Sequence, residues 1–362
     1  MEKHLLNKLN RNMKYYYFFI LLLILPVLSC DFDKDRYEKA VKFELKDFQT
    51  IKDLTSNRLE FDSLIMQPMD LVVYDSLLIT VEVGKEKIFH VYNLNTKTHI
   101  NQCINRGQGP EDMLQPEFMN CDEKSIRIID LATSSVFEYE LNDFITNQQP
   151  KPKKRTKLEK QIFLTAQQVD NKIMGCSYAY EDRLYIFDSG GKKINSIINY
   201  PARTIQQTNV EKTDAYYMKF ITNNINKIAL CYYMTDLIEI YNLEGVLEIR
   251  LHGPEQFFSY YKEYQDGKYV GASPIKGLNR DAYMCPRNAI NEFFVLYNGG
   301  FIDTPNHTTS CNQILSFTWD GIPRKIFNLN DPIFSFNVDS KNKKIFGISE
   351  IPEFHIVEYS YE

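Results

Sequence analysis

The sequence predicts an all-β fold, a six-bladed β-propeller whose ring is closed by the N-terminal strand completing the last blade. Three observations predict it: a pattern that recurs six times, a composition that favours strands, and a last repeat that is one strand short. In the pattern, an apolar run ends at Asp or Asn and a second apolar run starts one to six residues later. The recurring positions are Asp75, Asp122, Asp170, Asn226, Asn291 and Asp339. Their separations of 47, 48, 56, 65 and 48 residues are close to the period of about 40–50 residues typical of propellers.

The composition agrees with short strands packed face to face. Among the 362 residues are 24 Tyr and 24 Phe but only 15 Gly, and aromatic and β-branched side chains pack well on a pleated surface. The formal net charge is −5, which argues against sequence-independent nucleic-acid binding, because that requires a basic surface. The one basic run, residues 151–157, lies between two sets of strands and is interpreted as a solvated linker.

Each repeat divides into predicted strands. Blade one runs from Leu64 through 77–81 and 87–94 to 99–105. Blade two takes 118–121, 125–130 and 136–141, and blade three takes 162–169, 172–178, 183–188 and 194–200. The last three blades take these segments: 216–222, 227–234, 237–243 and 246–252 for blade four; 292–297, 313–319 and 324–329 for blade five; 333–338, 344–349 and 355–359 for blade six. Residues 257–289 lack a clean period and are interpreted as an insertion plus the inner strand of blade five.

Blade six has three strands, and residues 40–48 alternate in the manner of a strand without a neighbour in sequence. We therefore expect residues 40–48 to form the outer strand of blade six. Such closure removes a free sheet edge, which would otherwise invite aggregation.

The N-terminus has the pattern of an export signal. Four basic residues precede residues 15–28, fourteen residues without a charge, which is shorter than the roughly 20 that a bilayer span needs and matches a secretory signal. Residues 27–30 (VLSC) resemble a bacterial lipobox. The expected organisation is a lipoprotein-type signal peptide over 1–29, lipid attachment at Cys30, a flexible tether over 30–39 and the propeller over 40–362. The alternative is an ordinary signal peptide with a chance cysteine.

The remaining cysteines do not form a C-x-x-C pair, so zinc and thioredoxin-like chemistry are poorly supported. They are Cys103, Cys121, Cys176, Cys231, Cys285 and Cys311. They fall mostly inside apolar runs and are interpreted as buried small hydrophobic residues, with disulfides as the alternative in an exported chain.

The lipobox, the six turn positions and the junction Arg106-Gly107-Gln108-Gly109-Pro110-Glu111 together resemble the TolB-like six-bladed β-propeller lipoproteins of Gram-negative bacteria. The resemblance implies the fold and a place in the cell envelope, lipid-anchored at the outer membrane on its periplasmic or surface side. It carries over no catalytic residue.

Candidate chemistry is sparse in the sequence. Gly107-Gln108-Gly109 lacks the third glycine of a dinucleotide site, and no P-loop, H-E-x-x-H or G-x-S-x-G occurs. Because the fold resembles that of metal-dependent propeller hydrolases, Asp70, Asn120, Asn223 and Asn337 are the candidates for a calcium site, which needs six to eight oxygens. The competing interpretation of Asp and Asn at hairpins is that they bond their own turns.

Two functions follow as hypotheses. The first is a lipid-anchored envelope propeller that binds a protein, peptide or glycan without catalysis and without a cofactor. The alternative is a calcium-dependent propeller hydrolase or lyase acting at the mouth of the channel, the usual place for a ligand.

Overall fold

A computed structural model describes residues 35–162, 164–177, 182–197 and 199–362. The chain separates into two compact units. The smaller contains Asp35–Glu38 together with Ala202–Gln206, and the larger contains the remaining described residues. Cys30, the signal peptide over 1–29 and the first residues of the tether lie outside the described residues. In the described part of the chain, no helix has the length and apolar character needed to cross a membrane.

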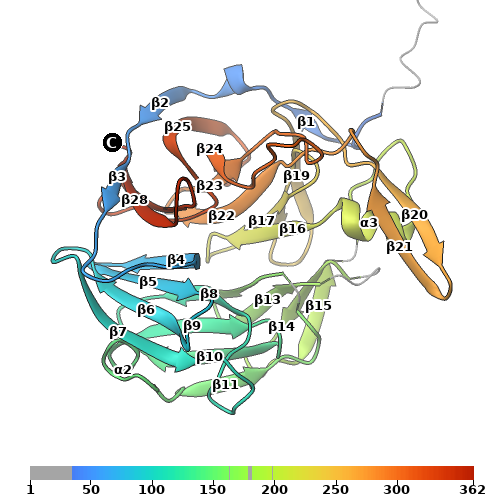
Figure 1. Cartoon of the computed structure of the whole chain (residues 1–362). Coiled ribbons are helices and arrows are strands. Elements are labelled where there is room, and N and C mark those ends of the chain that lie inside the picture. Colours follow the sequence, from blue (N-terminus) through green and yellow to red (C-terminus); the bar gives the residue numbers. More distant parts are fainter. Residues whose placement is uncertain (1–34, 163, 178–181, 198) are drawn as a thin grey trace, which may run out of the picture. The chain divides into compact units, whose positions relative to one another are not determined.

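The larger unit is a six-bladed propeller (Figure 1). Its first three blades are antiparallel four-stranded sheets whose strands follow one another along the chain. Blade one contains β4 (Pro68–Tyr74), β5 (Leu77–Glu82), β6 (Lys87–Asn93) and β7 (Thr98–Asn105). Blade two contains β8 (Pro116–Cys121), β9 (Ser125–Asp130), β10 (Ser135–Glu140) and β11 (Lys154–Lys157). Blade three contains β12 (Ala166–Val169), β13 (Lys172–Cys176), β14 (Leu184–Phe187) and β15 (Lys193–Ile197).

The last three blades recruit strands from the N-terminal part of the chain. Blade four contains β16 (Met218–Thr222), β17 (Lys227–Tyr232), β18 (Leu237–Asn242) and β19 (Leu247–His252). Blade five contains β22 (Tyr283–Ala289), β23 (Glu292–Tyr297), β24 (Cys311–Thr318) and β25 (Pro323–Ile333). Blade six contains β26 (Ser335–Asp339), β27 (Lys344–Ser349) and β28 (His355–Ser360). The first strands of the six blades contact one another in a closed cycle, β4–β8–β12–β16–β22–β26 and back to β4, which confirms both the fold and the number of blades.

An N-terminal strap, defined here as residues 41–59, runs across the outer strands of three blades. Its strands β1 (Val41–Lys42) and β2 (Thr50–Leu54) pair in parallel with β19 and β25. Its third strand, β3 (Asn57–Leu59), pairs with β28 and completes blade six. Ring closure by an N-terminal strand is therefore confirmed.

The prediction that residues 40–48 form the outer strand of blade six is wrong. Residues 40–48 do not reach blade six, because the 3₁₀ turn η1 (Leu45–Asp47) interrupts them and Val41–Lys42 already pairs with blade four.

A second correction concerns the basic run. Lys154–Lys157 is not a linker but the fourth strand of blade two, paired with β10. Lysines on such an outer strand protect an exposed sheet edge from pairing with another chain.

The six recurrent Asp and Asn positions all lie at the hairpin between the first and second strands of a blade. Their backbones and side chains suit this turn. Asp75 and Asp170 adopt positive φ values of 53° and 51°, and the Asp122 carboxylate accepts hydrogen bonds from the backbone N–H groups of Lys124 and Ser125, each at 2.9 Å. The interpretation that these residues bond their own turns is confirmed at Asp122 and also at Asp339.

The hydrophobic core lies between neighbouring sheets. One cluster joins blades four and five to the strap, where the buried rings of Phe43 and Phe48 both meet Phe317 at centroid distances of 5.5 Å. The strap also lies close against Gly253, because a Cβ at that position would come within 2.2 Å of the Phe43 carbonyl oxygen. The absence of a side chain at Gly253 is thus what allows this close approach.

The six cysteines among the described residues are free thiols. Five are buried and Cys121 is half-buried. Burial raises the pKa of the Cys121 thiol to about 12 and raises the pKa of Cys103 and Cys231 as well. They behave as small hydrophobic residues, as the sequence indicates.

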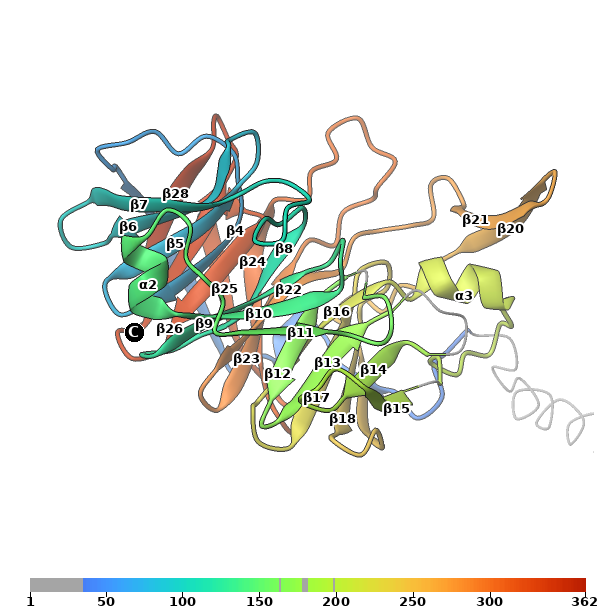
Figure 2. The ribbon, with the colours of Figure 1, turned by 90° about the horizontal axis from the view of Figure 1, so that it is seen from below.

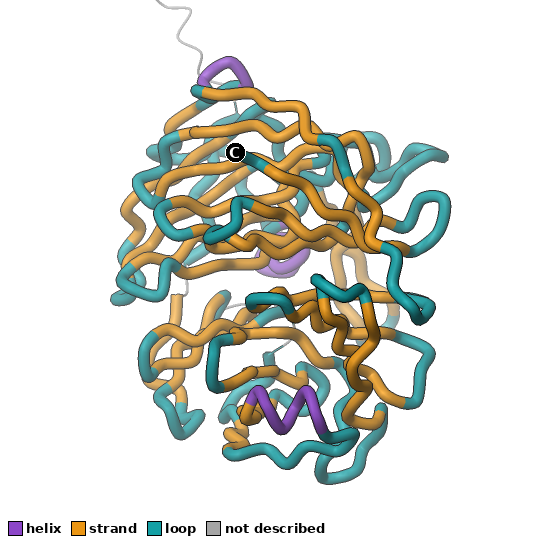
Figure 3. Tube along the Cα trace, turned by 90° about the vertical axis from the view of Figure 1, so that its left-hand side faces the viewer, coloured by secondary structure: helices purple, strands orange, loops and turns teal. Residues whose placement is uncertain are grey.

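Helices are short and few among the strands (Figure 3). The helix α2 (Leu141–Thr146) connects β10 to β11, and α3 (Asn209–Ala215) precedes blade four. The irregular region before blade five contains an antiparallel hairpin of β20 (Tyr261–Asp266) and β21 (Tyr269–Pro274), followed by β22. The hairpin extends beyond the blade sheets (Figure 2), and α3 contacts both of its strands. The expectation of an insertion plus the inner strand of blade five is confirmed.

The smaller unit pairs two short segments. The Glu38 N–H donates to the Ala202 carbonyl at 2.8 Å, and the Thr204 N–H donates to the Arg36 carbonyl at 3.0 Å. The Arg203 Nε donates to the Asp35 carboxylate at 2.7 Å. Asp35–Glu38, at the end of the predicted tether, thus make specific contacts.

Candidate functional site

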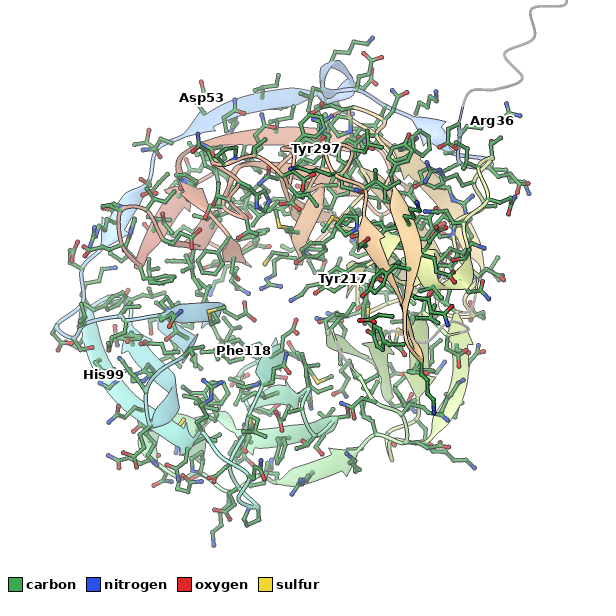
Figure 4. All side chains as sticks on the ribbon, turned by 45° about the vertical axis from the view of Figure 1, so that its right-hand side comes forward. Arg36, Asp53, His99, Phe118, Tyr217 and Tyr297 are labelled. Atoms are coloured by element: carbon green, nitrogen blue, oxygen red, sulfur yellow. The ribbon has the colours of Figure 1, made fainter. Side chains whose placement is uncertain are left out.

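The inner strands surround a central channel that contains two cavities, one toward each mouth. The wide cavity, of about 480 Å³, lies where the inner strands begin. The narrow cavity, of about 260 Å³, lies where they end. Asp70 and Arg287 line both cavities, so this pair marks the boundary between them. In Figure 4, Tyr217 and Phe118 lie near the middle of the ring, whereas His99 and Asp53 lie toward its periphery.

Two ion pairs form the polar floor of the wide cavity. The Lys219 Nζ lies 3.1 Å from Glu117 Oε1, and the Arg287 Nη2 lies 2.8 Å from Asp70 Oδ1. The Ser335 hydroxyl donates a further hydrogen bond to Asp70 at 2.9 Å. These groups come from β8, β16, β4, β22 and β26, so the floor forms only when the ring is closed.

The four charged side chains are largely withdrawn from solvent. Their exposed fractions are 27% for Lys219, 11% for Glu117, 18% for Arg287 and 17% for Asp70. Burial alone would lower the pKa of Lys219, but the nearby Glu117 carboxylate, with Tyr233 and Asp70, outweighs it and raises this pKa. Lys219 is therefore a permanent cation at neutral pH.

Two tyrosines stand beside this floor. Tyr217 and Tyr233 make an edge-to-face contact with ring centroids 4.8 Å apart, and both line the wide cavity. Burial raises the pKa of each phenol, so both carry their protons at neutral pH. Groups whose pKa values lie far from neutrality are poorly suited to proton transfer but well suited to hydrogen bonding and to contact with a ligand's apolar face.

Apolar side chains complete the walls of the wide cavity. Met69, Leu114, Leu164, Met284 and Phe334 line it, and Arg106 stands exposed among its lining residues. A concave, mostly apolar site with a few convergent polar groups is the usual form of a ligand pocket. The arrangement can recognise a ligand that offers both hydrogen-bonding and apolar surface.

Three of the four residues proposed from the sequence as metal ligands come together. Asp70, Asn120 and Asn337 line the narrow cavity. Asn223 is not among its lining residues; its side-chain oxygen accepts hydrogen bonds from the N–H groups of Ile225, Asn226 and Lys227 at 3.0, 2.8 and 2.9 Å. Asn223 is thus engaged in its own turn.

The donor set is poorly matched to calcium. Asp70 is the one carboxylate among the residues lining the narrow cavity, and the Arg287 guanidinium already holds it at 2.8 Å. Calcium prefers six to eight oxygen ligands with several carboxylates, and a guanidinium beside the site repels a cation. Within the described ranges, no three or more His, Cys, Asp or Glu side chains are grouped to hold a metal ion.

The sequence interpretation missed the charged floor of the wide cavity. Lys219 and Glu117 are each the one charged residue of an inner strand, in the segments Met218–Thr222 and Pro116–Cys121. A lone charge inside an inner strand was the available signal, since charged residues are almost never buried unless paired.

Comparisons with known proteins agree with this architecture. A TolB-like 6-blade propeller-like family model matches residues 47–341. A member of the duf4221 family from Bacteroides vulgatus has a similar fold, with a TM-score of 0.56, 9% identity, and coverage of 86% of this chain and 96% of that one. Raptor from Chaetomium thermophilum has a TM-score of 0.51 and 9% identity over 85% of this chain, which spans only 29% of the Raptor chain.

No curated protein matches the chain by sequence. The two structural similarities show the fold alone, because both identities are low. The family match covers most of the chain, including the inner strands that line the channel. The chain therefore belongs to the TolB-like six-blade propeller family.

Proposed function

We propose that this protein is a lipid-anchored propeller of the bacterial cell envelope that binds a protein, peptide or glycan at the wide cavity without catalysis. The observation that carries the proposal is the floor of paired charges beside Tyr217 and Tyr233, in a cavity of about 480 Å³. The family is associated with the bacterial cell envelope, and its propellers are commonly binding scaffolds. The predicted signal peptide over 1–29 and the lipobox at 27–30 support the anchor.

The chemistry of the cavity favours binding. The two cations of its floor, Lys219 and Arg287, are already paired with carboxylates, so a ligand gains most by hydrogen bonding to the edges of these pairs and packing on the tyrosines and the apolar wall. The junction at residues 106–115, the β20–β21 hairpin and the loop at 298–310 all leave the sheets at the end where inner strands begin. Loops gathered on one face are where repeat proteins bind large ligands.

The binding part is tested with peptide and glycan arrays probed with the purified chain. Lys219→Met should weaken any array hit at least tenfold, which corresponds to about 1.4 kcal/mol, because it removes the cation and leaves Glu117 unpaired. Lys227→Met is the matched control, since Lys227 pairs with Glu248 of blade four and Asp320 of blade five and does not line the cavity. Arrays without hits, or hits equally strong in Lys219→Met, would contradict binding at the wide cavity.

The anchor is tested separately at Cys30. Cys30→Ala should move the protein from the membrane fraction to the soluble fraction and abolish incorporation of a radiolabelled fatty acid, because acyl chains contribute about 0.8 kcal/mol per buried CH₂. Cys121→Ala is the control, because Cys121 lies within blade two. Membrane association that persists in Cys30→Ala would exclude the lipid anchor.

A further inference from the structure

The narrow cavity is lined by amide side chains from five of the six blades. They are Asn120, Gln167, Gln168, Asn224, Asn288 and Asn337. The remaining blade, blade one, contributes Asp70. From this ring of amides we infer a second binding site, at the mouth opposite the wide cavity, for a neutral monosaccharide or a similarly small polyol.

Much of the hydrogen-bonding capacity of these amides is unused within the protein. Gln168 donates to the Asp170 carbonyl at 3.1 Å, and the oxygens of Asn224 and Asn337 accept from Thr222 and from the Val73 N–H at 3.0 and 3.4 Å. Each amide offers two donors and an acceptor, so these contacts leave all three NH₂ groups with further donors.

Three other amides have even fewer partners. Across the described residues, no hydrogen bond to the side chain of Asn120, Gln167 or Asn288 is formed, and the Asn288 oxygen is buried without a partner. A buried polar group left unpaired costs about 1–3 kcal/mol. A ligand that carries several hydroxyl groups can satisfy donors and acceptors together, because each hydroxyl both donates and accepts.

The charge of the cavity selects a neutral ligand. Its two charged residues, Asp70 and Arg287, are paired with each other at 2.8 Å. The Arg287 Nε and Nη1 groups donate to the Phe336 and Pro286 carbonyls, so its remaining capacity for an anion is small. Neither a free anion nor a free cation finds an uncompensated partner here.

The size and walls of the cavity select a small ligand. Its volume of about 260 Å³ lies just below the range of roughly 300–1,000 Å³ for small-molecule sites, which favours one sugar ring over an oligosaccharide. Phe118, Val72 and Val338 are among the lining residues and offer apolar surface to the C–H face of a ring.

The test is saturation-transfer NMR and calorimetry of the purified chain with glucose, galactose, mannose, N-acetylglucosamine and myo-inositol. At least one should bind with a millimolar or lower dissociation constant. Asn288→Leu and Gln167→Leu should each weaken it at least tenfold. Gln102→Leu is the matched control, because Gln102 is exposed on β7, the outer strand of blade one.

A second variant guards against misfolding. If Asn288→Leu fails to fold, Asn120→Leu takes its place, because Asn120 is exposed on the same mouth. The inference would be overturned if none of the five compounds bound, or if binding were unchanged in all amide variants. A calorimetric response to calcium chloride alone would overturn it as well. Lys219→Met should leave sugar binding unchanged, so this site and the wide cavity succeed or fail independently.

Discussion

Glu239→Gln should lower the free energy of unfolding by about 3–5 kcal/mol, because it leaves two buried arginines without their anion. The Glu239 side chain is fully buried, and those of Arg183 and Arg250 are 2% and 7% exposed. Glu239 Oε1 accepts from Arg250 Nε at 2.8 Å, and its Oε2 accepts from Arg183 Nη1 at 3.3 Å. Since Arg183 belongs to blade three and Glu239 to blade four, this cluster also joins two blades.

Urea denaturation at pH 7 measures the effect. Glu248→Gln is the control, because Glu248 pairs with Lys227 at 3.3 Å while 35% exposed, and such pairs contribute only about 0–1 kcal/mol. Equal losses in the two variants would contradict a stabilising role for the buried cluster.

The pH dependence of the Glu239 effect has a defined sign. Burial alone would raise the pKa of Glu239, but the two arginines outweigh it and hold this pKa below its ordinary value of 4.5. The folded state thus binds fewer protons than the unfolded state, so the stabilisation is fully present above pH 4.5 and is lost as the pH falls through the folded-state pKa. The difference between wild type and Glu239→Gln should therefore shrink on acidification below pH 4.5.

Phe48→Ala should cost about 3–5 kcal/mol, the usual range for removing a buried aromatic ring. The Phe48 ring is 7% exposed and packs edge-to-face on Phe317, with Phe43 at a centroid distance of 6.0 Å. Removing it leaves a cavity where the strap meets the core of blades four and five.

Thermal and urea denaturation check this result. Ile51→Ala in β2 is the matched control, because Ile51 belongs to the same strap but is 61% exposed, and its loss should stay within about 0.5 kcal/mol. A Phe48→Ala variant as stable as Ile51→Ala would show that the strap is held by its backbone pairing alone.

The blades could be predicted because their signal is local. Each hairpin is specified by residues a few positions apart, as when Asp122 bonds Lys124 and Ser125, so the turn recurs visibly in the sequence. The strap could not be placed, because β1 and β3 have only two and three residues and their partners lie hundreds of residues away. A strand that short has no alternation from which to assign a sheet.

The candidate site was harder to predict for a related reason. Glu117 and Lys219 are 102 residues apart, and Asp70 and Arg287 are 217 residues apart. Only ring closure brings them to the channel. Asp70 and two amides were found from the sequence because they lie on inner strands, whereas β11 was mistaken for a linker because an edge strand rich in lysine has the composition of a loop.

The strap has a consequence for biosynthesis. Residues 41–59 leave the ribosome long before their partner strands, which end at His252, Ile333 and Ser360. Pairings of such large sequence separation form slowly, and the last of them, Glu358 with Asn57, awaits nearly the whole polypeptide. The ring therefore cannot close until nearly the whole chain has been synthesised.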